Sequence, residues 1–340
     1  MNVAINGFGR IGRLTLKIML EDKDINVVAI NNPSTPPDQL AYLLKFDSVH
    51  GSYNKSVESF EDHIIVDKKH KIYILRYKDP KDIPYSELNI EYMIDSTGLF
   101  TNKEKTLCYM NNKYIKKVVV TSPSEDIPTY VMGVNHEEYN NEKIVSNASC
   151  TTNCIGPILK LLNNTFDIKE AKILTIHSST ASQSVVDKSN GKNWRLGRST
   201  LNNIIPTSTG ASDALVKIMP YLKGKIIASS IRVPTVDGSI VFLDIIFNKK
   251  TNLEEINELI KTHSKSPENM NIIEFSNDHL VSSDIIGKTF STIYDSLGST
   301  QLNKKSFQLA CWYDNETGYS NRVVNLLKHI SLLSDNKNKI

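Results

Sequence analysis

At the start of the chain, an apolar run at 3–6 is followed by a glycine-rich turn and then by Leu14, Ile18 and Leu20 at helical spacing. A second apolar run follows at 27–31. Apolar runs between turn residues are typical of buried strands, and a period of about 3.6 is typical of a helix with one buried face. The pattern therefore predicts a β-turn-α-β unit.

Short apolar runs then alternate with helical stretches up to the middle of the chain. We expect strands at 64–66, 72–75, 92–95, 118–120 and 144–145. Strands that alternate with helices favour a mostly parallel sheet with both faces covered. The first part of the chain is therefore predicted to be a Rossmann-type, doubly wound α/β domain.

The pattern changes after Cys150. Longer segments now alternate apolar and polar positions, at 172–177, 225–232, 238–247 and 307–313. Such alternation is typical of an antiparallel or mixed sheet with one covered face. We therefore expect an α+β domain in this part of the chain.

The domain boundary is placed just before Cys150, so the predicted domains are 1–149 and 150–315. The last amphipathic helix, at 321–333, lies within the remaining segment 316–340. We expect this helix to pack back onto the first domain.

The turn after the first strand carries Gly7, Gly9 and Gly12, which have the spacing of the dinucleotide-binding fingerprint. In that motif the first glycine makes the tight turn, the second lets the backbone approach a pyrophosphate, and the third lets the helix pack against the strand. The bare pattern is weak evidence. Here a strand precedes it, a helix follows it and a second strand ends at the required distance, so we predict a dinucleotide site.

About twenty residues beyond the last glycine, an acidic residue usually binds the adenine ribose 2′-hydroxyl. This chain has Asn32 there. An amide can bind a hydroxyl, but it lacks the charge that repels a 2′-phosphate. The site is therefore expected to discriminate weakly between NAD and NADP, and Ser34 is expected to donate a hydrogen bond to the 2′-phosphate of NADP. A turn that favours Asn and Pro explains the same residues equally well.

Two polar loops, 95–98 and 121–123, each follow a predicted strand. The carboxyl ends of strands are where doubly wound sheets bind their ligands. We therefore expect both loops, including Ser122, to contact the cofactor.

Composition narrows the class of protein. The 340 residues allow two domains, each with its own core. The net charge of +3 comes from interspersed cations and anions, so no dedicated nucleic-acid surface is expected. No apolar run reaches the roughly 18 residues of a membrane span, so no membrane association is expected.

The chain begins with Met1 and Asn2, which lead directly into a core-type strand and leave no room for a secretory or transit segment. Four Cys without a disulfide pattern suit a reducing compartment. We therefore expect a cytoplasmic protein.

The segment 146–154 places Cys150 between an apolar run and apolar residues at helical spacing, which predicts a strand-to-helix turn. Free N–H groups and the positive end of a helix dipole can lower a thiol pKa well below its free value of about 8.5. We therefore expect a reactive thiolate. The alternative is a small buried Cys without chemistry.

His177 ends a predicted strand. A lone His in such a place is usually structural, but beside an activated Cys it is the obvious general base, because a pKa of about 6.5 lets it accept a thiol proton and return it. No pair of Cys or His has the spacing of a metal site, so no metal is expected.

Residues that can bind anions cluster further along, at Thr180, Arg195, Arg198, 207–210 and Arg232. The run 207–210 directly precedes a helix-like segment, so its amides can bind a phosphate. The alternative for Arg195 and Arg198 is a solvated charge pair.

Taken together, the sequence resembles the phosphorylating glyceraldehyde-3-phosphate dehydrogenase family over nearly its whole length. The matching blocks, in order and spacing, are 6–13, 146–154, 204–206, 232–235 and 312–316. The resemblance implies an NAD(P)-binding domain followed by a catalytic domain. It also implies oxidation of glyceraldehyde 3-phosphate with NADP or NAD and inorganic phosphate to 1,3-bisphosphoglycerate, and a homotetramer.

The resemblance further implies a role for each matching residue. Cys150 would be the nucleophile and His177 the acid and base. Asn315 would hold the nicotinamide carboxamide, and Tyr319 would pack near that ring. The other implied ligands are Thr180, Arg198 and Arg232 for the substrate phosphate, Ser149, Thr151, Thr209 and Gly210 for inorganic phosphate, and Gly9, Arg10, Ile11 and Asn32 for the cofactor.

The chain departs from the NAD-specific members of that family. Asn32 replaces an Asp, and Lys188 and Ser189 stand where those members commonly have Leu-Pro, in a loop that faces a neighbouring subunit's adenosine. Lys188 would add a cation near a 2′-phosphate. We therefore expect good use of NADP, with NAD also accepted. Ser179, where many relatives have Tyr, has no explanation from the sequence.

Two alternatives stay open. An enzyme resembling erythrose-4-phosphate dehydrogenase shares the Cys and the His but lacks the residues that bind the accepting phosphate, and Thr180, Thr209 and Gly210 argue against it. A non-enzymatic binding or regulatory protein on the same scaffold is the second alternative, and the presence of every chemical residue argues against it.

Overall fold

The computed structural model describes residues 1–191, 193–269 and 271–337, and its internal contacts divide the chain into two units. The first unit contains Met1–Tyr130, His136–Ser149 and the chain from Ser320 onward. The second contains Val131–Asn135 and Cys150–Tyr319. The chain therefore passes into the second unit at Cys150, and the short segment Val131–Asn135 joins that unit rather than the predicted first domain.

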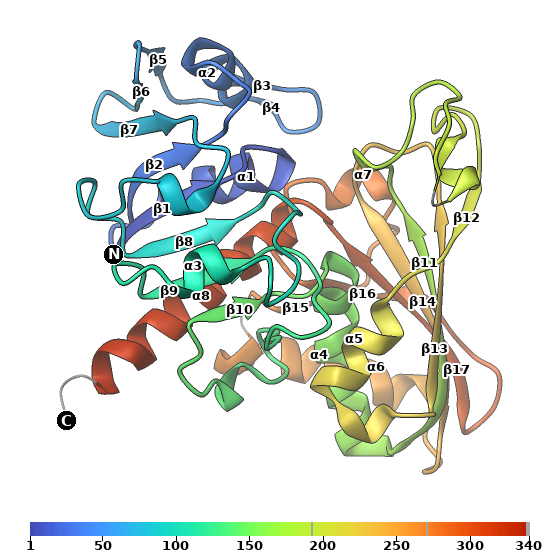
Figure 1. Cartoon of the computed structure of the whole chain (residues 1–340). Helices are drawn as coiled ribbons and strands as arrows, with labels where there is room; N and C mark the ends of the chain where they lie inside the picture. Colours follow the sequence, from blue (N-terminus) through green and yellow to red (C-terminus); the bar gives the residue numbers. More distant parts are fainter. Residues whose placement is uncertain (192, 270, 338–340) are drawn as a thin grey trace. The chain divides into compact units, whose positions relative to one another are not determined.

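Within the described residues, the first unit is built on an eight-stranded sheet with the order β10-β9-β8-β1-β2-β7-β6-β5 (Figure 1). The strands from β10 to β7 are parallel, and β6 and β5 are antiparallel additions at one edge. The predicted Rossmann-type, mostly parallel sheet is confirmed. Its strands are β1 (Asn2–Asn6), β2 (Asn26–Asn31), β5 (Val57–Ser59), β6 (His63–Val66), β7 (His70–Leu75), β8 (Tyr92–Asp95), β9 (Lys117–Val120) and β10 (Ile144–Ser146).

The remaining elements of this unit surround the sheet and its loops. They are α1 (Arg10–Met19), α2 (Pro37–Lys45), α3 (Leu107–Met110), the short pair β3 (Phe46–Asp47) and β4 (Gly51–Ser52), and most of α8 (Thr317–Lys337). Helix α1 has one covered face because Gly12, Leu16 and Met19, spaced i, i+4 and i+7, lie on the same side, and all three are buried. No helix in the described part of the chain has both the length and the apolar character needed to cross a membrane.

The glycine turn between β1 and α1 has the geometry that the motif requires. Gly7 has a φ of 91°, in the left-handed region that favours glycine. A Cβ on Gly12 would lie 2.2 Å from the carbonyl oxygen of Gly7, so only glycine lets the helix pack this close. The predicted roles of these two glycines are confirmed.

The second unit is built on a seven-stranded sheet with the order β12-β13-β11-β14-β17-β16-β15 among the described residues. The pairs β11–β13 and β15–β16 are parallel, and the others are antiparallel. The predicted mixed sheet is confirmed. Its strands are β11 (Ile168–His177), β12 (Ile205–Thr207), β13 (Ile226–Arg232), β14 (Ser239–Phe247), β15 (Ile273–Ser276), β16 (Thr292–Gln301) and β17 (Ser306–Tyr313).

Helices cover one face of this second sheet. Figure 1 shows α4 (Cys150–Phe166), α5 (Ala211–Ile218) and α6 (Leu253–Ser264) on the same side of the strands, while the short α7 (Ser282–Ile285) lies near β17. On β11, Ile173, Thr175 and His177 are buried, while Leu174 and Ile176 between them are half-buried. This alternation is the predicted sheet with one covered face.

Strands β12, β15 and β16 were not predicted. The sequence of β16 contains Asp295 and Gly298, residue types with low strand propensity. Its register with β17 also shifts between Asp295 and Thr300. β12 is short and contains Pro206. Pairing with neighbouring strands, which the local pattern does not show, makes these segments extended.

Candidate active site

The chain turns sharply before Cys150, because Ala148 has a φ of 55°, a value that residues other than glycine rarely adopt. Cys150 then begins α4, which confirms the predicted strand-to-helix turn. Its Sγ lies 3.5 Å from Nε2 of His177, the last residue of β11. Within the second unit, a helix start and a strand end therefore bring a thiol and an imidazole into contact.

The other ring nitrogen of His177 has two neighbours. Strands β11 and β13 are parallel, and their register places His177 opposite Arg232. Nδ1 lies 2.8 Å from the carbonyl oxygen of Ser178 and 2.5 Å from Nη1 of Arg232. A carbonyl only accepts, so Ser178 favours the tautomer that leaves Nε2 free to take the thiol proton. A guanidinium only donates, so Arg232 favours the opposite tautomer.

Burial opposes charge on both members of the pair. It raises the pKa of the Cys150 thiol, although Arg232 and hydrogen bonds from Thr151 act to lower it. Burial, together with the charge of Arg232, lowers the pKa of His177 to about 3. The expected low thiol pKa is therefore wrong for this arrangement, because lost hydration outweighs the helix start and the arginine. These shifts favour the uncharged form of both groups at neutral pH, so we expect the thiolate to form by proton transfer to His177.

Tyr313, at the end of β17, contacts both His177 and the first turn of α4, and a role for it was not predicted. Its ring meets the ring of His177 edge-on, with centroids 5.9 Å apart. Its hydroxyl lies 3.0 Å from Oγ1 of Thr151, in the first turn of α4. The residue lies inside the matching block 312–316, so the sequence signal was present without a role attached to it.

Asn315 follows β17, and its side chain is held by two hydroxyls that the sequence analysis missed. Oγ of Ser178 donates to its Oδ1 at 2.8 Å, and Oγ of Ser239 donates at 2.7 Å. The same Ser178 contacts His177 through its carbonyl. These serines lie 137 and 76 residues away from Asn315 in sequence, so no local pattern connects them.

The predicted phosphate ligands lie at element ends and in loops. Oγ1 of Thr180 is 3.0 Å from Oγ of Ser182, and Thr209 and Gly210 directly precede α5. The hydroxyl of Thr209 accepts from the first amide of that helix at 3.3 Å. Arg232 contacts His177 directly. The structure thus brings Arg232 and Thr151 to the catalytic pair.

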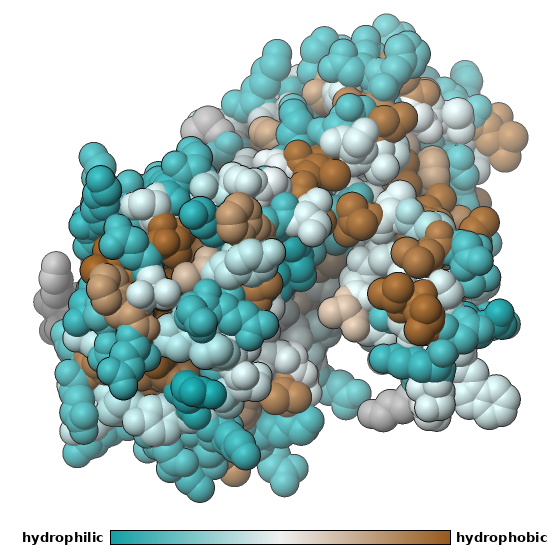
Figure 2. Space-filling view, turned by 90° about the horizontal axis from the view of Figure 1, so that it is seen from above, coloured by the Kyte–Doolittle hydropathy of each residue, from teal (hydrophilic) through white to brown (hydrophobic). Residues whose placement is uncertain are grey.

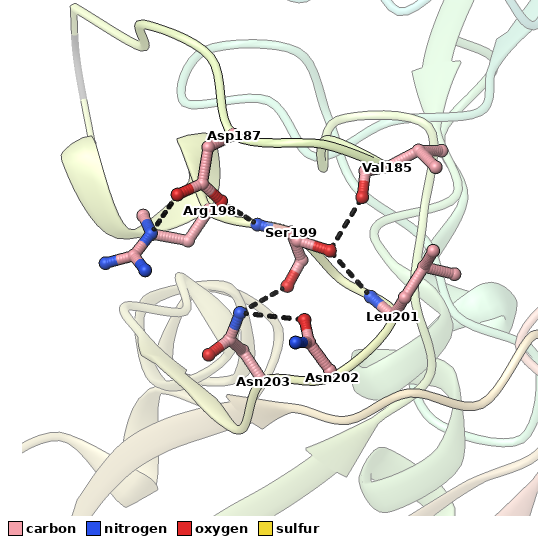
Figure 3. A network of polar contacts seen from close by, with 7 residues as sticks. All are labelled: Val185, Asp187, Arg198, Ser199, Leu201, Asn202 and Asn203. Atoms are coloured by element: carbon pink, nitrogen blue, oxygen red, sulfur yellow. Dashed lines mark hydrogen bonds and ion pairs between the residues drawn. The ribbon is translucent and has the colours of Figure 1, made fainter.

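Arg198 lies in an exposed loop, where Figure 3 shows it beside Asp187. Its Nε donates to Oδ2 of Asp187 at 2.7 Å, and the amide of Ser199 donates to the other carboxylate oxygen at 2.8 Å (Figure 3). The Arg198 side chain is 63% exposed. The role of Arg198 as a substrate ligand therefore stays a prediction.

Ser179, which the sequence left unexplained, joins two loops of the second unit. Its Oγ is hydrogen-bonded to the hydroxyl of Thr200 and donates to the carbonyl of Val233 at 3.1 Å. Gln183 donates to the same Thr200 hydroxyl at 3.3 Å and accepts from the Thr180 amide at 3.0 Å. Ser179 therefore helps to hold the loop that carries Thr180.

In the first unit, the glycine turn leaves an open edge. Gly9 is exposed, and a Cβ added to it would meet nothing within 4 Å. Ile11 is partly exposed, and Arg10 forms a 2.6 Å ion pair with Asp47. Burial raises the pKa of Asp47, but the amide of His50, Arg10 and another backbone amide outweigh it and lower the pKa to about 2.

At the next strand end, Asn32 lies beside the end of β7, since its amide donates to the carbonyl of the last β7 residue at 2.9 Å. The register pairs Asn31 with Leu75, and Asn32 and Arg76 are the residues that directly follow these two paired positions. The side chain of Asn31 bonds both the amide and the carbonyl of Tyr77 at 2.9 Å, which fixes this segment. Arg76 is a cation that the sequence analysis missed. Ser34 is exposed.

The other predicted cofactor residues lie apart along the chain. Ser122 follows β9, and its Oγ is buried with no hydrogen-bond partner among the residues that the structure describes. Tyr319 is buried in the first turn of α8. Lys188 and Ser189 are exposed in a loop of the second unit. The structure leaves their cofactor roles as predictions.

A buried polar network at the carboxyl ends of β1 and β8 was also missed. Asp95 accepts from Asn6 at 2.9 Å, from Tyr109 at 2.6 Å and from the hydroxyl of Thr97 at 2.7 Å. Asn6 in turn accepts from Asn31 at 2.8 Å. This network fixes the strand ends from which the predicted cofactor loops leave the sheet.

These features of the first unit fit a dinucleotide cofactor. The open edge at Gly9 lies at the start of α1, where backbone amides and the helix dipole favour a phosphate. The buried, unpartnered hydroxyl of Ser122 lies at the same carboxyl edge of the sheet. The donor set and its position are those that doubly wound sheets use for NAD or NADP.

Comparison with known proteins agrees with this geometry. Residues 1–103 match the family model for the glyceraldehyde 3-phosphate dehydrogenase NAD binding domain, and residues 149–315 match the model for the C-terminal domain of the same enzyme. The chain belongs to the glyceraldehyde-3-phosphate dehydrogenase family.

Relatives within the glyceraldehyde-3-phosphate dehydrogenase family align with nearly the whole length of the chain. Glyceraldehyde-3-phosphate dehydrogenase 1 of Kluyveromyces lactis is 45% identical over 97% of this chain and 100% of that protein. Glyceraldehyde-3-phosphate dehydrogenase 2 of Saccharomyces cerevisiae is 46% identical over 97% of this chain and 99% of that protein. The family assignment therefore covers both units.

Proposed function

We propose that this protein oxidises glyceraldehyde 3-phosphate to 1,3-bisphosphoglycerate with NADP or NAD and inorganic phosphate, through a thioester on Cys150. The observation that carries the proposal is the 3.5 Å contact between Sγ of Cys150 and Nε2 of His177, inside a chain of this family. A half-buried thiol beside an imidazole is an arrangement suited to covalent catalysis on an aldehyde.

The first step uses the neutral pair. The thiol proton of Cys150 moves to Nε2 of His177 while Sγ forms a bond to the aldehyde carbon. The same proton then passes to the developing oxygen, and amides at the start of α4 stabilise that oxygen. The product is a hemithioacetal on Cys150, in which all atoms and protons are accounted for.

The second step oxidises this adduct. A nicotinamide cofactor, when bound, would supply the hydride acceptor. Nε2 of His177 takes the hydroxyl proton as the hydride leaves carbon, which leaves a thioester on Sγ. An oxygen of inorganic phosphate then attacks the thioester carbon, and the carbon–sulfur bond breaks. The proton on Nε2 of His177 returns to the leaving sulfur, the proton of the attacking phosphate passes to solvent, and the acyl phosphate is released with the neutral pair restored.

Arg232 connects substrate binding to this proton transfer. As a ligand of the substrate phosphate, its guanidinium gains an anionic partner. Ser178 then remains as the partner of Nδ1, which keeps the tautomer whose Nε2 accepts a proton. The other proposed phosphate ligands are Thr180 and Arg198 for the substrate, and Ser149, Thr151, Thr209 and Gly210 for inorganic phosphate.

The cofactor is held, in our proposal, by Gly9, Arg10, Ile11, Asn32, Ser34, Ser122, Asn315 and Tyr319, with Lys188 and Ser189 acting on a neighbouring subunit's cofactor. Use of NADP is supported by Asn32, which does not repel a 2′-phosphate, and by the cation Arg76 just after the neighbouring strand β7. We therefore expect NADP to be used well and NAD also to be accepted.

The protein is proposed to be a cytoplasmic homotetramer. Apolar side chains reach the surface of the second unit, where Ile227 is 65% and Ile204 is 72% exposed. Leu174 and Phe242, cross-strand partners on the sheet face away from the helices, are half-buried. Figure 2 shows hydrophobic residues in small groups among hydrophilic ones. Association of identical chains would cover such groups.

One steady-state experiment tests the function. Turnover of glyceraldehyde 3-phosphate is measured with NADP and with NAD, each with and without inorganic phosphate. We expect turnover to require phosphate. Turnover that is unchanged without phosphate would instead support an enzyme that uses water, like the erythrose-4-phosphate alternative. A preference for NAD above about a hundredfold, which is roughly 2.7 kcal/mol, would contradict the role given to Asn32.

A further inference from the structure

The side chain of Asn315 has a defined hydrogen-bond pattern on one of its two ends. Its Oδ1 receives the hydroxyls of Ser178 and Ser239 at 2.8 and 2.7 Å. An amide oxygen has two lone pairs, so these two donors saturate it. Ser178 and Ser239 are both buried, so their hydroxyl protons need partners within the protein.

The backbone determines which way the Ser239 hydroxyl points. The amide of Ser178 donates to Oγ of Ser239 at 3.1 Å, so that oxygen already acts as an acceptor. Its own proton is then directed to Oδ1 of Asn315 at 2.7 Å, because the other acceptor in reach, Oγ of Ser178, is farther away at 3.4 Å. A rotated Asn315 amide would put NH₂ against both hydroxyls and leave a buried hydroxyl proton without an acceptor among the described residues of this unit. The serines therefore select one amide orientation.

The selected orientation leaves the other end of Asn315 available. Within the described part of the second unit, no acceptor lies within hydrogen-bond distance of Nδ2. Its two protons therefore remain for a ligand that offers an acceptor. In a nicotinamide carboxamide, the carbonyl oxygen is the acceptor and the NH₂ group is a donor.

We propose that Ser178 and Ser239 are positioning residues that orient Asn315 so that its Nδ2 donates to the carboxamide oxygen of the cofactor. This inference rests on the proposed cofactor role of Asn315. The carbonyl oxygen of Ser178 also lies 2.8 Å from Nδ1 of His177 and can accept a hydrogen bond from it. One residue thus holds the proton acceptor with its backbone and the cofactor ligand with its side chain.

Binding measurements on the full-length protein test this without a catalytic readout. The variants are Ser178→Ala and Ser239→Ala, and the dissociation constants of NAD and NADP are measured by calorimetry. We expect each variant to bind both cofactors roughly three- to tenfold more weakly, the usual contribution of one neutral hydrogen bond. Ser178→Ala keeps the backbone carbonyl, so the rate of Cys150 alkylation by iodoacetamide should stay unchanged.

A double-mutant cycle shows whether the serines act through Asn315. In an Asn315→Ala background, adding either serine substitution should weaken binding no further. Ser264→Ala, whose hydroxyl bonds only its own helix, serves as the matched control and should bind like the wild type. Thermal unfolding of each variant confirms that it is folded. An equal loss of affinity with and without the Asn315 side chain overturns the proposal, as does unchanged affinity in folded serine variants.

A cofactor analogue tests the direction of the hydrogen bond. The 3-acetylpyridine analogue keeps the carbonyl and replaces NH₂ by methyl. If Nδ2 donates to the carbonyl, the serine variants should lose as much affinity for this analogue as for NAD. Loss with NAD alone would mean that Asn315 binds the NH₂ group instead. A wild-type protein that binds dinucleotides but fails to oxidise the aldehyde would refute the proposed reaction and leave this inference intact.

Discussion

The two units use buried polar groups in opposite ways. In the first unit, Asp95 accepts hydrogen bonds from Asn6 and Tyr109, and its pKa is raised by burial although those bonds act to lower it. In the second unit, Cys150 and His177 face each other across 3.5 Å, and two neighbours compete for one ring nitrogen. A saturated network holds loops in place, while a pair with more than one proton arrangement can do chemistry.

The largest effect is expected on the catalytic side of this comparison. Cys150→Ala removes the sulfur to which the substrate bonds and should lower kcat by at least about 10³-fold. Steady-state assays measure this. Cys108→Ser, at a thiol on α3 in the first unit, is the matched control and should keep its activity. A Cys150→Ala enzyme with about a tenth of normal turnover would rule out the covalent route.

His177→Asn keeps a polar side chain but removes the proton acceptor. We expect kcat to fall roughly 10²- to 10⁴-fold, the usual contribution of a general base. Alkylation of Cys150 by iodoacetamide at neutral pH should also slow, because no group takes the thiol proton. The control is His263→Asn, at a histidine on α6 that is hydrogen-bonded to Asn269. Unchanged alkylation in His177→Asn would show that the thiol ionises without the imidazole.

In the hydrogen-bonded network of the first unit, Asp95→Ala should reduce the stability of the fold rather than the reactivity of Cys150. The change leaves donors on Asn6, Thr97 and Tyr109 without their buried acceptor, which should lower the free energy of unfolding by roughly 3 kcal/mol. Urea unfolding measures this, with the exposed Asp278→Ala as control. The alkylation rate of Cys150 in the folded variant should stay normal. A variant as stable as the wild type would mean that the hydrogen bonds of Asp95 do not stabilise the fold.

The low pKa of His177, about 3 in the folded protein, gives a pH dependence of stability. The unfolded chain binds a proton at a pKa of about 6.5, so as pH falls below that value unfolding takes up a proton and the free energy of unfolding decreases. The stability from this group is complete above about pH 6.5, and its slope below is at most about 1.4 kcal/mol per pH unit. Urea unfolding of His177→Asn should show a shallower slope, and an identical slope would contradict the buried neutral imidazole.

The smallest effect is expected at Ser179. Ser179→Ala removes the hydroxyl that joins Thr200 and Val233, so the loop carrying Thr180 should be held less firmly. We expect the KM for glyceraldehyde 3-phosphate to rise roughly two- to fivefold with kcat unchanged. Ser179→Thr keeps a hydroxyl and should restore most of the wild-type KM. A fall in kcat with a normal KM would place Ser179 in the chemical step instead.

Much of the fold could be predicted because the elements concerned follow from patterns within short segments of the sequence. Buried strands such as β1 are short apolar runs, and the face of α1 follows the helical period. The glycine turn, the helix start at Cys150 and the strand end at His177 were predicted in the same way. β16 was missed because Asp295 and Gly298 interrupt its run of strand-forming residues, and pairing with neighbouring strands keeps the whole segment extended.

The sequence by itself therefore determined the fold class, the family and the identity of the thiol and the imidazole, because each depends on patterns within a few residues or on matching blocks. Only the tertiary structure decided their environment. It paired Arg10 with Asp47, bound Asn315 to Ser178 and Ser239, and raised rather than lowered the pKa of the Cys150 thiol. Hydration and hydrogen-bond partners depend on residues far apart in sequence, and only the folded chain brings them together.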